Sequence, residues 1–199
     1  MAEGVAPFIS KMTGAQVGLR IISNLGNERL TTASFKIPLE RLEYKGFSGT
    51  EVAERIVEAY EWAKDDKYRA VTHNKGIMNG IDAVAVATGQ DWRAIEAACH
   101  AWASTESGYQ PLTRYWIDKS TQPALFCGEL ILPLHVGTKG GVLKTHPTYN
   151  YALGIMGFPT SAELAMSMAC VGLAQNFAAL RALCTEGISR GHMALHARK

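Results

Sequence analysis

The spacing of apolar residues predicts a chain built mostly of helices. Apolar stripes at helical spacing predict helices over residues 2–13, 49–64 and 72–89, and a further stripe predicts a helix after residue 91. Residues 160–186 are apolar on almost every face, so we expect them to form one long helix at the centre of the fold.

Polar residues at the predicted helix starts support these boundaries. Ser48 with Glu51, and Thr160 with Glu163, have the spacing of capping boxes. Asp91 is placed to cap the helix that follows it, and this structural role alone explains an aspartate there. A capping carboxylate keeps lone pairs for a second partner such as a lysine, so a functional role remains open.

Short apolar segments outside the helices predict strands. They are 16–23, 32–38, 113–118 and 125–133, with turn residues over 24–27 between the first two. The pattern therefore predicts an α+β fold in which helices dominate the later part of the chain.

The composition is that of an ordinary globular protein: 47% of the residues are hydrophobic, 19% are charged, and the net charge is +2. The near-neutral charge gives no indication of nucleic acid or an anionic membrane as a partner.

The four cysteines form no CxxC pair and are expected to be buried free thiols, as in a reducing compartment. Polar residues interrupt the longest apolar stretch, which favours a core helix over a membrane span. With no signal peptide at the start, we expect a cytoplasmic protein.

Both ends of the chain have the pattern of interior sequence. Met1 leads directly into an apolar, helical run, and residues 191–199 resemble a helix that is just beginning. Natural domains usually end in polar, frayed segments. We therefore expect this chain to be part of a longer one.

One polar stripe is a candidate site. Lys75, Asn79 and Asp82 fall on one face of the predicted 72–89 helix, and Gly76 and Gly80 flank them. A lysine and an amide on a glycine-lined stripe suit a pocket for an oxygen-rich ligand. The alternative is an ordinary solvated face, but each glycine costs about 1 kcal/mol of helix stability relative to alanine, which favours the functional interpretation.

Other polar residues carry weaker signals. Arg69 is either a surface residue or an anion clamp, and the glycine-rich loop 137–141 matches no phosphate-binding pattern. His192 and His196 have the spacing of a zinc pair, but the glutamate of an HExxH motif is missing, so we expect no metal site. His192 is a better candidate for a proton donor.

Three long segments resemble class II (bacterial-type) 3-hydroxy-3-methylglutaryl-CoA (HMG-CoA) reductases. They are 65–103, which contains HNKGIMNGID, 132–147, which contains HVGTKGG, and 171–198, which contains SRGHMALHAR. The resemblance covers essentially the whole chain and implies that family's fold. It implies the end of a small, ferredoxin-like NAD(P)-binding domain, the second part of a large, helix-rich substrate domain and the start of a C-terminal flap, at residues 1–28, 29–186 and 187–199 respectively.

The resemblance also implies roles for single residues. Lys75 and Asp91 correspond to the catalytic lysine and aspartate, and His192 to the histidine that protonates the departing CoA thiolate. A lysine stabilises the negative charge that develops on a carbonyl oxygen, and an adjacent carboxylate opposes loss of its proton. Arg69 and Asn79 correspond to substrate-positioning residues, and an arginine suits the glutaryl carboxylate.

The family reduces HMG-CoA to mevalonate and free CoA by two hydride transfers from NADH or NADPH. The resemblance implies these substrates, and a homodimer whose active sites lie at the interface. Asn24 is the candidate contact to the nicotinamide cofactor. The family's catalytic glutamate and dinucleotide motif lie before Met1, so we expect the 199 residues alone to be inactive. The alternative is a non-catalytic CoA-thioester-binding protein of the same fold.

Overall fold

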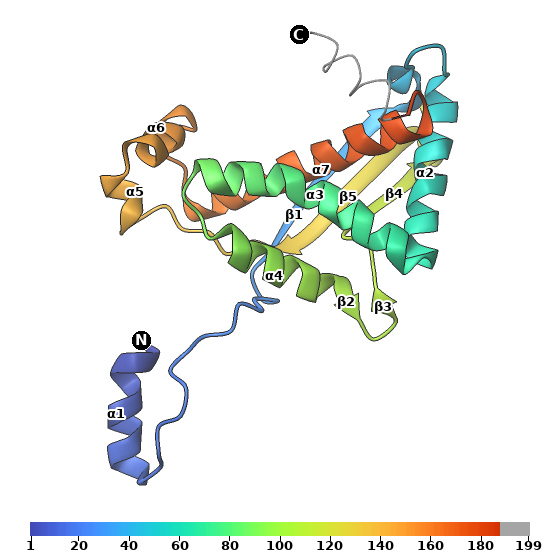
Figure 1. Cartoon of the computed structure of the whole chain (residues 1–199). Helices are drawn as coiled ribbons and strands as arrows, with labels where there is room; N and C mark the ends of the chain where they lie inside the picture. The colour runs from blue at the N-terminus through green and yellow to red at the C-terminus, as the bar shows by residue number, and fades with distance from the viewer. Residues whose placement is uncertain (188–199) are drawn as a thin grey trace.

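The computed structural model describes residues 1–187, in which helices pack on one antiparallel sheet (Figure 1). The helices are α1 (Ala2–Thr13), η1 (Leu39–Leu42), α2 (Gly49–Asp65), α3 (Lys67–Ala87), α4 (Trp92–Ala103), α5 (Val142–Thr145), α6 (Pro147–Ile155) and α7 (Ser161–Cys184). The strands are β1 (Leu30–Pro38), β2 (Ser104–Thr105), β3 (Gly108–Tyr109), β4 (Thr113–Asp118) and β5 (Leu125–Pro133). The α+β fold that the sequence predicts is therefore confirmed.

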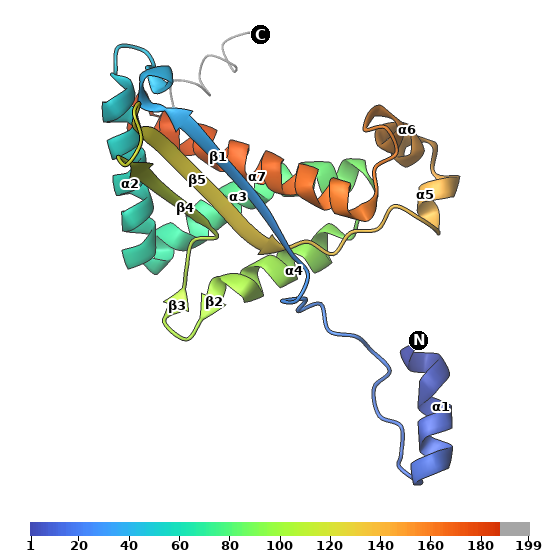
Figure 2. The same cartoon turned by 180° about the vertical axis from the view of Figure 1, so that it is seen from behind.

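The main sheet has the order β1-β5-β4, and β2 and β3 form a separate two-stranded sheet; every neighbouring pair is antiparallel. Helices α3 and α7 lie side by side across one face of the main sheet, and Figure 2 shows the other face without a helix over it. Alternation along the strands fits this arrangement: Ala33 of β1 is buried, whereas its neighbours Thr32 and Ser34 are exposed.

The core lies between the sheet and these two helices. Its largest fully buried side chains include Tyr115 and Phe126 from the sheet and Ile77 and Met168 from the helices. Glycines allow α3 and α7 to approach closely, because a Cβ on Gly172 would lie 2.9 Å from Ile81 Cγ1. Gly80 has the same role towards Val171 and Gln175. Gly80 therefore packs against α7, and it also lines the hollow that contains Asn79.

The N-terminal segment stands apart from this body in both views. The predicted helix 2–13 is confirmed as α1, which has no buried residue and ends at Gly14 in the left-handed conformation. The predicted strand 16–23 is wrong: this segment is in neither a strand nor a helix, and its Leu19 side chain is 91% exposed. Its apolar alternation suits a strand, but the segment has no partner strand within residues 1–187.

Most predicted boundaries agree with the structure. The helix expected over 72–89 begins earlier, at Lys67, because the Asp66 side chain caps it by accepting a hydrogen bond from Tyr68 N (2.9 Å). Ser48 caps α2 as predicted, but the Glu51 carboxylate pairs with Arg55 (2.8 Å). The capping box that begins α7 is complete.

Helix α7 is less enclosed than its sequence predicts. It packs on α3, β1 and β5, but Met166, Cys170 and Val171 are exposed. The expectations of a fully central helix and of four buried thiols are therefore wrong at these positions. By length and composition alone α7 resembles a membrane span, and its packing on the sheet is that of a core helix with one uncovered apolar side.

Candidate active site

The outer face of α3 carries the predicted polar stripe. Lys75 and Asn79 are exposed on it, one turn apart, and Asp82 is half-buried farther along. Among residues 1–187, the Lys75 ammonium makes no ion pair. An exposed lysine and an exposed amide on one helix face are available to bind a ligand.

The inner face of the same helix carries buried polar residues whose side chains bond to neighbouring elements, although His73 Nδ1 has no partner within residues 1–187. The Asn74 amide donates to Gln110 O (2.8 Å) and accepts from Leu112 N (2.9 Å), which joins α3 to the segment before β4. His73 Nε2 lies 2.5 Å from Thr113 Oγ1. Burial lowers the pKa of His73 to about 3, with Arg69 adding to the effect, so the ring is neutral near pH 7. The expectation that His73 is structural is consistent with this geometry.

A buried amide completes this junction from α7. Asn176 Nδ2 donates to the backbone oxygen of His73 (3.3 Å), and its Oδ1 accepts from Tyr115 Oη (2.8 Å). One polar cluster thereby connects α3, β4 and α7. The junction fixes the α3 backbone directly behind Lys75, so the catalytic candidate stands on a rigid support.

Arg69 lies one turn before His73, near the end of α7. It is half-buried, and burial lowers the pKa of its guanidinium. None of the ion pairs within residues 1–187 includes Arg69. A guanidinium that is partly desolvated and unpaired suits the binding of a carboxylate.

Asp91 lies at the opposite end of α3, where the chain turns into α4 (Figure 1). Its carboxylate caps α4 by accepting from Ala94 N (3.1 Å), as predicted. The preceding residue, Gln90, donates to Gly137 O (3.0 Å) and accepts from Gly137 N (2.9 Å). The glycine-rich loop is therefore fixed beside Asp91. The sequence analysis missed Gln90, although its place between Gly89 and the capping aspartate was a usable signal.

Lys75 and Asp91 lie far apart within one chain. The part of α3 from Lys75 to Ala87 is about 18 Å long, and Asp91 follows it. No ion pair within residues 1–187 joins the two side chains. The expected contact between them stays a prediction.

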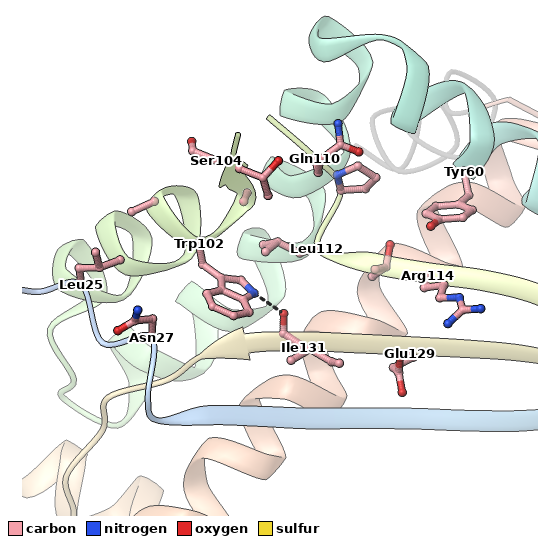
Figure 3. Close-up of a pocket in the computed structure, with 15 residues that line it drawn as sticks. Leu25, Asn27, Tyr60, Trp102, Ser104, Gln110, Leu112, Arg114, Glu129 and Ile131 are labelled. Carbon is pink, nitrogen blue, oxygen red and sulfur yellow. Dashed lines mark hydrogen bonds between the residues drawn. The ribbon is translucent and has the colours of Figure 1, made fainter. Parts of the chain in front are cut away.

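Two hollows lie near these elements. One, of about 430 Å³, lies between α3, α6 and α7, and its lining joins Asn79 to apolar residues such as Ile155 and Val171. The other, of about 610 Å³, lies between the end of α4 and the sheet, where Trp102 Nε1 donates to Ile131 O (3.2 Å; Figure 3). Only the first contains a predicted site residue, so we place the second outside the candidate site.

The remaining predicted residues lie near the ends of the described chain or outside it. Asn24 is exposed in the extended segment before β1, and His135 Nε2 bonds to Gly26 O (3.0 Å) in that segment. A side chain at Gly26 would collide with the His135 ring, so this close approach requires glycine. His192 and His196 lie outside the described residues. Within residues 1–187, no cluster of three metal-ligating side chains is present.

Comparison with known proteins gives the family. The family model for hydroxymethylglutaryl-coenzyme A reductase matches residues 1–197. The chain is 50% identical over its whole length to the 3-hydroxy-3-methylglutaryl-coenzyme A reductase of Archaeoglobus fulgidus, and 40% identical to a probable one of Borreliella burgdorferi. It spans 43% and 45% of these relatives, which is less than half of their length.

Solved structures agree. The reductase of Streptococcus pneumoniae has a TM-score of 0.85 and 43% identity, over 98% of this chain and 46% of that one. The class II enzyme of the same organism, bound to NADPH in open conformations, matches equally well. Family model, sequence identity and fold agree over the whole chain, which therefore belongs to the hydroxymethylglutaryl-CoA reductase family.

Proposed function

We propose that this chain forms part of an enzyme that reduces HMG-CoA to mevalonate and free CoA. The reaction consumes two NAD(P)H and two protons, and it breaks the thioester carbon–sulfur bond. This proposal rests on the outer face of α3. Lys75 and Asn79 are exposed there, and the inner face of the same helix is held by hydrogen bonds to neighbouring elements. Family membership supplies the reaction that this face serves.

Lys75 acts on the carbonyl oxygen. When hydride reaches the carbonyl carbon, negative charge develops on that oxygen, and an ammonium placed beside it lowers the barrier. Asn79 lies one turn away on the same face and positions the substrate by hydrogen bonds. Arg69, almost three turns before Asn79 on the same helix, binds the carboxylate of the glutaryl group.

His192 is the proposed proton donor. Cleavage of the carbon–sulfur bond releases a thiolate, and an imidazolium within hydrogen-bond reach converts it to a thiol that departs. The second reduction, of the aldehyde, expels no thiolate.

Asn24 is the proposed cofactor contact. Its exposed side chain offers both a donor and an acceptor, which fits the carboxamide of a nicotinamide. The bound cofactor supplies the hydride. The class II enzyme of Streptococcus pneumoniae binds NADPH, and NADH carries the same nicotinamide group.

We also propose a homodimer in which Asp91 of one chain meets Lys75 of its partner. Within one chain the two residues are too far apart to touch, and each is exposed. Apolar side chains of α6 and α7 are exposed on the same side as the Asn79 hollow, among them Ile155 and Val171. A two-fold contact through this side joins the two half-sites.

Mixing two inactive variants tests both proposals. In a reductase of full family length that contains this chain, Lys75→Ala and Asp91→Asn are purified separately, then mixed and allowed to exchange subunits. If each site takes Lys75 and Asp91 from different chains, a mixed dimer has one intact site and equal mixing restores about a quarter of wild-type activity. If one chain supplies both residues, mixing restores nothing.

The alternative of a non-catalytic CoA-thioester-binding protein makes a different prediction. It requires tight binding of HMG-CoA without substrate-dependent NAD(P)H oxidation in the full-length wild type.

For the chain itself, we propose a boundary near residue 28 between the small and the large domain, because α1 and its extended segment stand apart from the body. We further propose that the enzyme is cytoplasmic.

A further inference from the structure

A tight turn between η1 and α2 lies beside the end of α7 (Figure 1). In this turn the backbones of Tyr44 and Phe47 bond to each other in both directions. The two central residues, Lys45 (φ 49°) and Gly46 (φ 89°), both have positive φ, as in a type I′ turn. A lysine at such a position carries a backbone cost that glycine avoids.

The side chains of this turn bind both carboxylate oxygens of Glu186, two residues after α7. Tyr44 Oη donates to Glu186 Oε1 (3.0 Å), and the Lys45 ammonium donates to Oε2. The Glu186 side chain is only 21% exposed, whereas both partners of the Lys64–Glu61 pair on α2 are at least 41% exposed. A carboxylate that is largely removed from water depends strongly on its partners. The two bonds to Glu186 are called the α7 anchor below.

Helix α2 holds the same end of α7 from a second side. Arg55 Nη1 donates to the backbone oxygen of Cys184 (3.0 Å), and Cys184 Sγ donates to Arg55 O (3.4 Å). The guanidinium carbon of Arg181 also lies 4.4 Å from the centroid of the Tyr44 ring. The end of α7 is therefore fixed to both α2 and the turn before it.

The chain continues from this anchor to the proposed proton donor. His192 lies six residues after Glu186, outside the described residues. Six residues reach at most about 20 Å even when they are fully extended. The position of Glu186 therefore sets the region that the His192 side chain can reach, and a displaced anchor moves that region.

We propose that Tyr44 and Lys45 are positioning residues for the thioester step: by binding Glu186 they fix the point from which the chain continues to His192. This inference rests on the proposed role of His192. Loss of the anchor lets the end of α7 move, so the imidazolium is less often within reach of the departing thiolate. Reduction of the aldehyde expels no thiolate and does not depend on the anchor.

Steady-state kinetics of a full-length reductase that contains this chain test the positioning. Glu186→Gln should lower kcat with HMG-CoA about tenfold or more, but kcat with free mevaldehyde by less than about twofold. Glu61→Gln is the matched control, because it removes the same charge from a more exposed ion pair, and it should change neither value. Equal losses on both substrates for Glu186→Gln, or no loss, overturn the proposal.

Two substitutions of Lys45 separate positioning from stability. Lys45→Gly removes the ammonium but relieves the positive φ, so the Tm should stay within about 2 °C of wild type while kcat with HMG-CoA falls at least about fivefold. Lys45→Arg keeps a charged donor and should keep at least about half of the wild-type kcat. Wild-type kcat in Lys45→Gly, or a loss that accompanies a lower Tm and affects both substrates, overturns the role of Lys45.

Amide hydrogen exchange of the same full-length proteins tests the anchor without reference to activity. Gly187 N donates to Ala182 O (2.7 Å), so exchange of this amide reports local opening at the end of α7. Peptides that contain Gly187 should exchange at least about fivefold faster in Glu186→Gln than in wild type or in Glu61→Gln. Equal exchange in all three proteins overturns the anchor.

The two proposals fail in distinguishable ways. If His192→Gln slows both substrates alike, the proposed role of His192 fails, and the positioning role falls with it. If His192→Gln spares mevaldehyde but Glu186→Gln slows both substrates alike, the positioning role alone is overturned.

Discussion

The two faces of α3 carry similar residue types but have opposite roles. On the inner face, Asn74 and His73 are buried, and their side chains bond to neighbouring elements. On the outer face, Lys75 and Asn79 are exposed. Within residues 1–187, no ion pair includes Lys75. Polar groups on the inner face are held by the fold, whereas those on the outer face are exposed, and we propose that they bind the substrate. Mutations should therefore separate stability from turnover within a single helix.

Lys75→Ala should have the largest effect on turnover. We expect kcat to fall by at least about 1000-fold, a barrier increase of about 4 kcal/mol, because the charge on the carbonyl oxygen loses its ammonium. The Tm should change by less than about 2 °C, since the side chain is exposed. Steady-state rates and thermal unfolding of one preparation measure both. Turnover within about tenfold of wild type contradicts the assignment.

Two histidine substitutions, His192→Gln and His73→Gln, compare a proposed proton donor with a buried structural residue. His192→Gln should slow the thioester step roughly 100-fold while it spares reduction of free mevaldehyde, because only the first expels a thiolate. His73→Gln should affect both substrates equally, through lost stability. Equal losses on both substrates for His192→Gln contradict its role as the proton donor.

Asn74→Ala and Asn79→Ala form a matched pair for stability. Asn74→Ala leaves a buried amide N–H and a buried carbonyl without partners, which should cost about 2–4 kcal/mol and lower the Tm by roughly 5–15 °C. Asn79→Ala should keep the Tm within about 1 °C and raise KM for HMG-CoA. If Asn79→Ala has a lower Tm than Asn74→Ala, the distinction between the inner and the outer face of α3 is contradicted.

The pH dependence of stability reports on His73. Its pKa is lowered to about 3 in the folded chain from 6.5, so between these values the unfolded chain binds more protons. The free energy of unfolding should therefore fall as the pH drops from 6.5 towards 3, and it should fall less in the His73→Gln variant. Urea unfolding at a series of pH values measures the slope, and parallel slopes contradict the buried, neutral ring.

Gln90→Ala should have the smallest effect. It removes both bonds to Gly137 and frees the glycine-rich loop beside Asp91, which should raise KM by about three- to tenfold. Gln110→Ala is a suitable control, since Gln110 uses its backbone oxygen to bond Asn74. If Gln110→Ala raises KM as much as Gln90→Ala does, the role of the Gln90–Gly137 bonds in holding the loop is contradicted.

Local signals in the sequence predicted the local structure. Asp91 and Thr160 cap the helices expected of them, and the strands 113–118 and 125–133 have the predicted bounds. Capping and periodicity depend on neighbours a few residues away, which a single sequence displays.

Contacts between distant segments were beyond the sequence. The run 16–23 has the alternation of a strand, but pairing depends on a second strand that no local pattern reveals. The bonds of the Gln90 side chain to the Gly137 backbone join two segments whose proximity arises only when α3 turns towards α4 and β5 leads into the glycine-rich loop. The roles proposed for the site residues came from the family resemblance. The structure added that Lys75 and Asp91 lie far apart within one chain.

The sheet order has a consequence for synthesis on the ribosome. β1 pairs along its whole length with β5, from Leu30 opposite Pro133 to Pro38 opposite Leu125. Nearly one hundred residues must therefore leave the ribosome before β1 finds its partner, and until then its edge is open to other chains. Helices α2, α3 and α4 lie between the two strands in sequence and depend on local hydrogen bonds, so they can form during this interval. The nascent chain should therefore be most prone to aggregation just before β5 emerges.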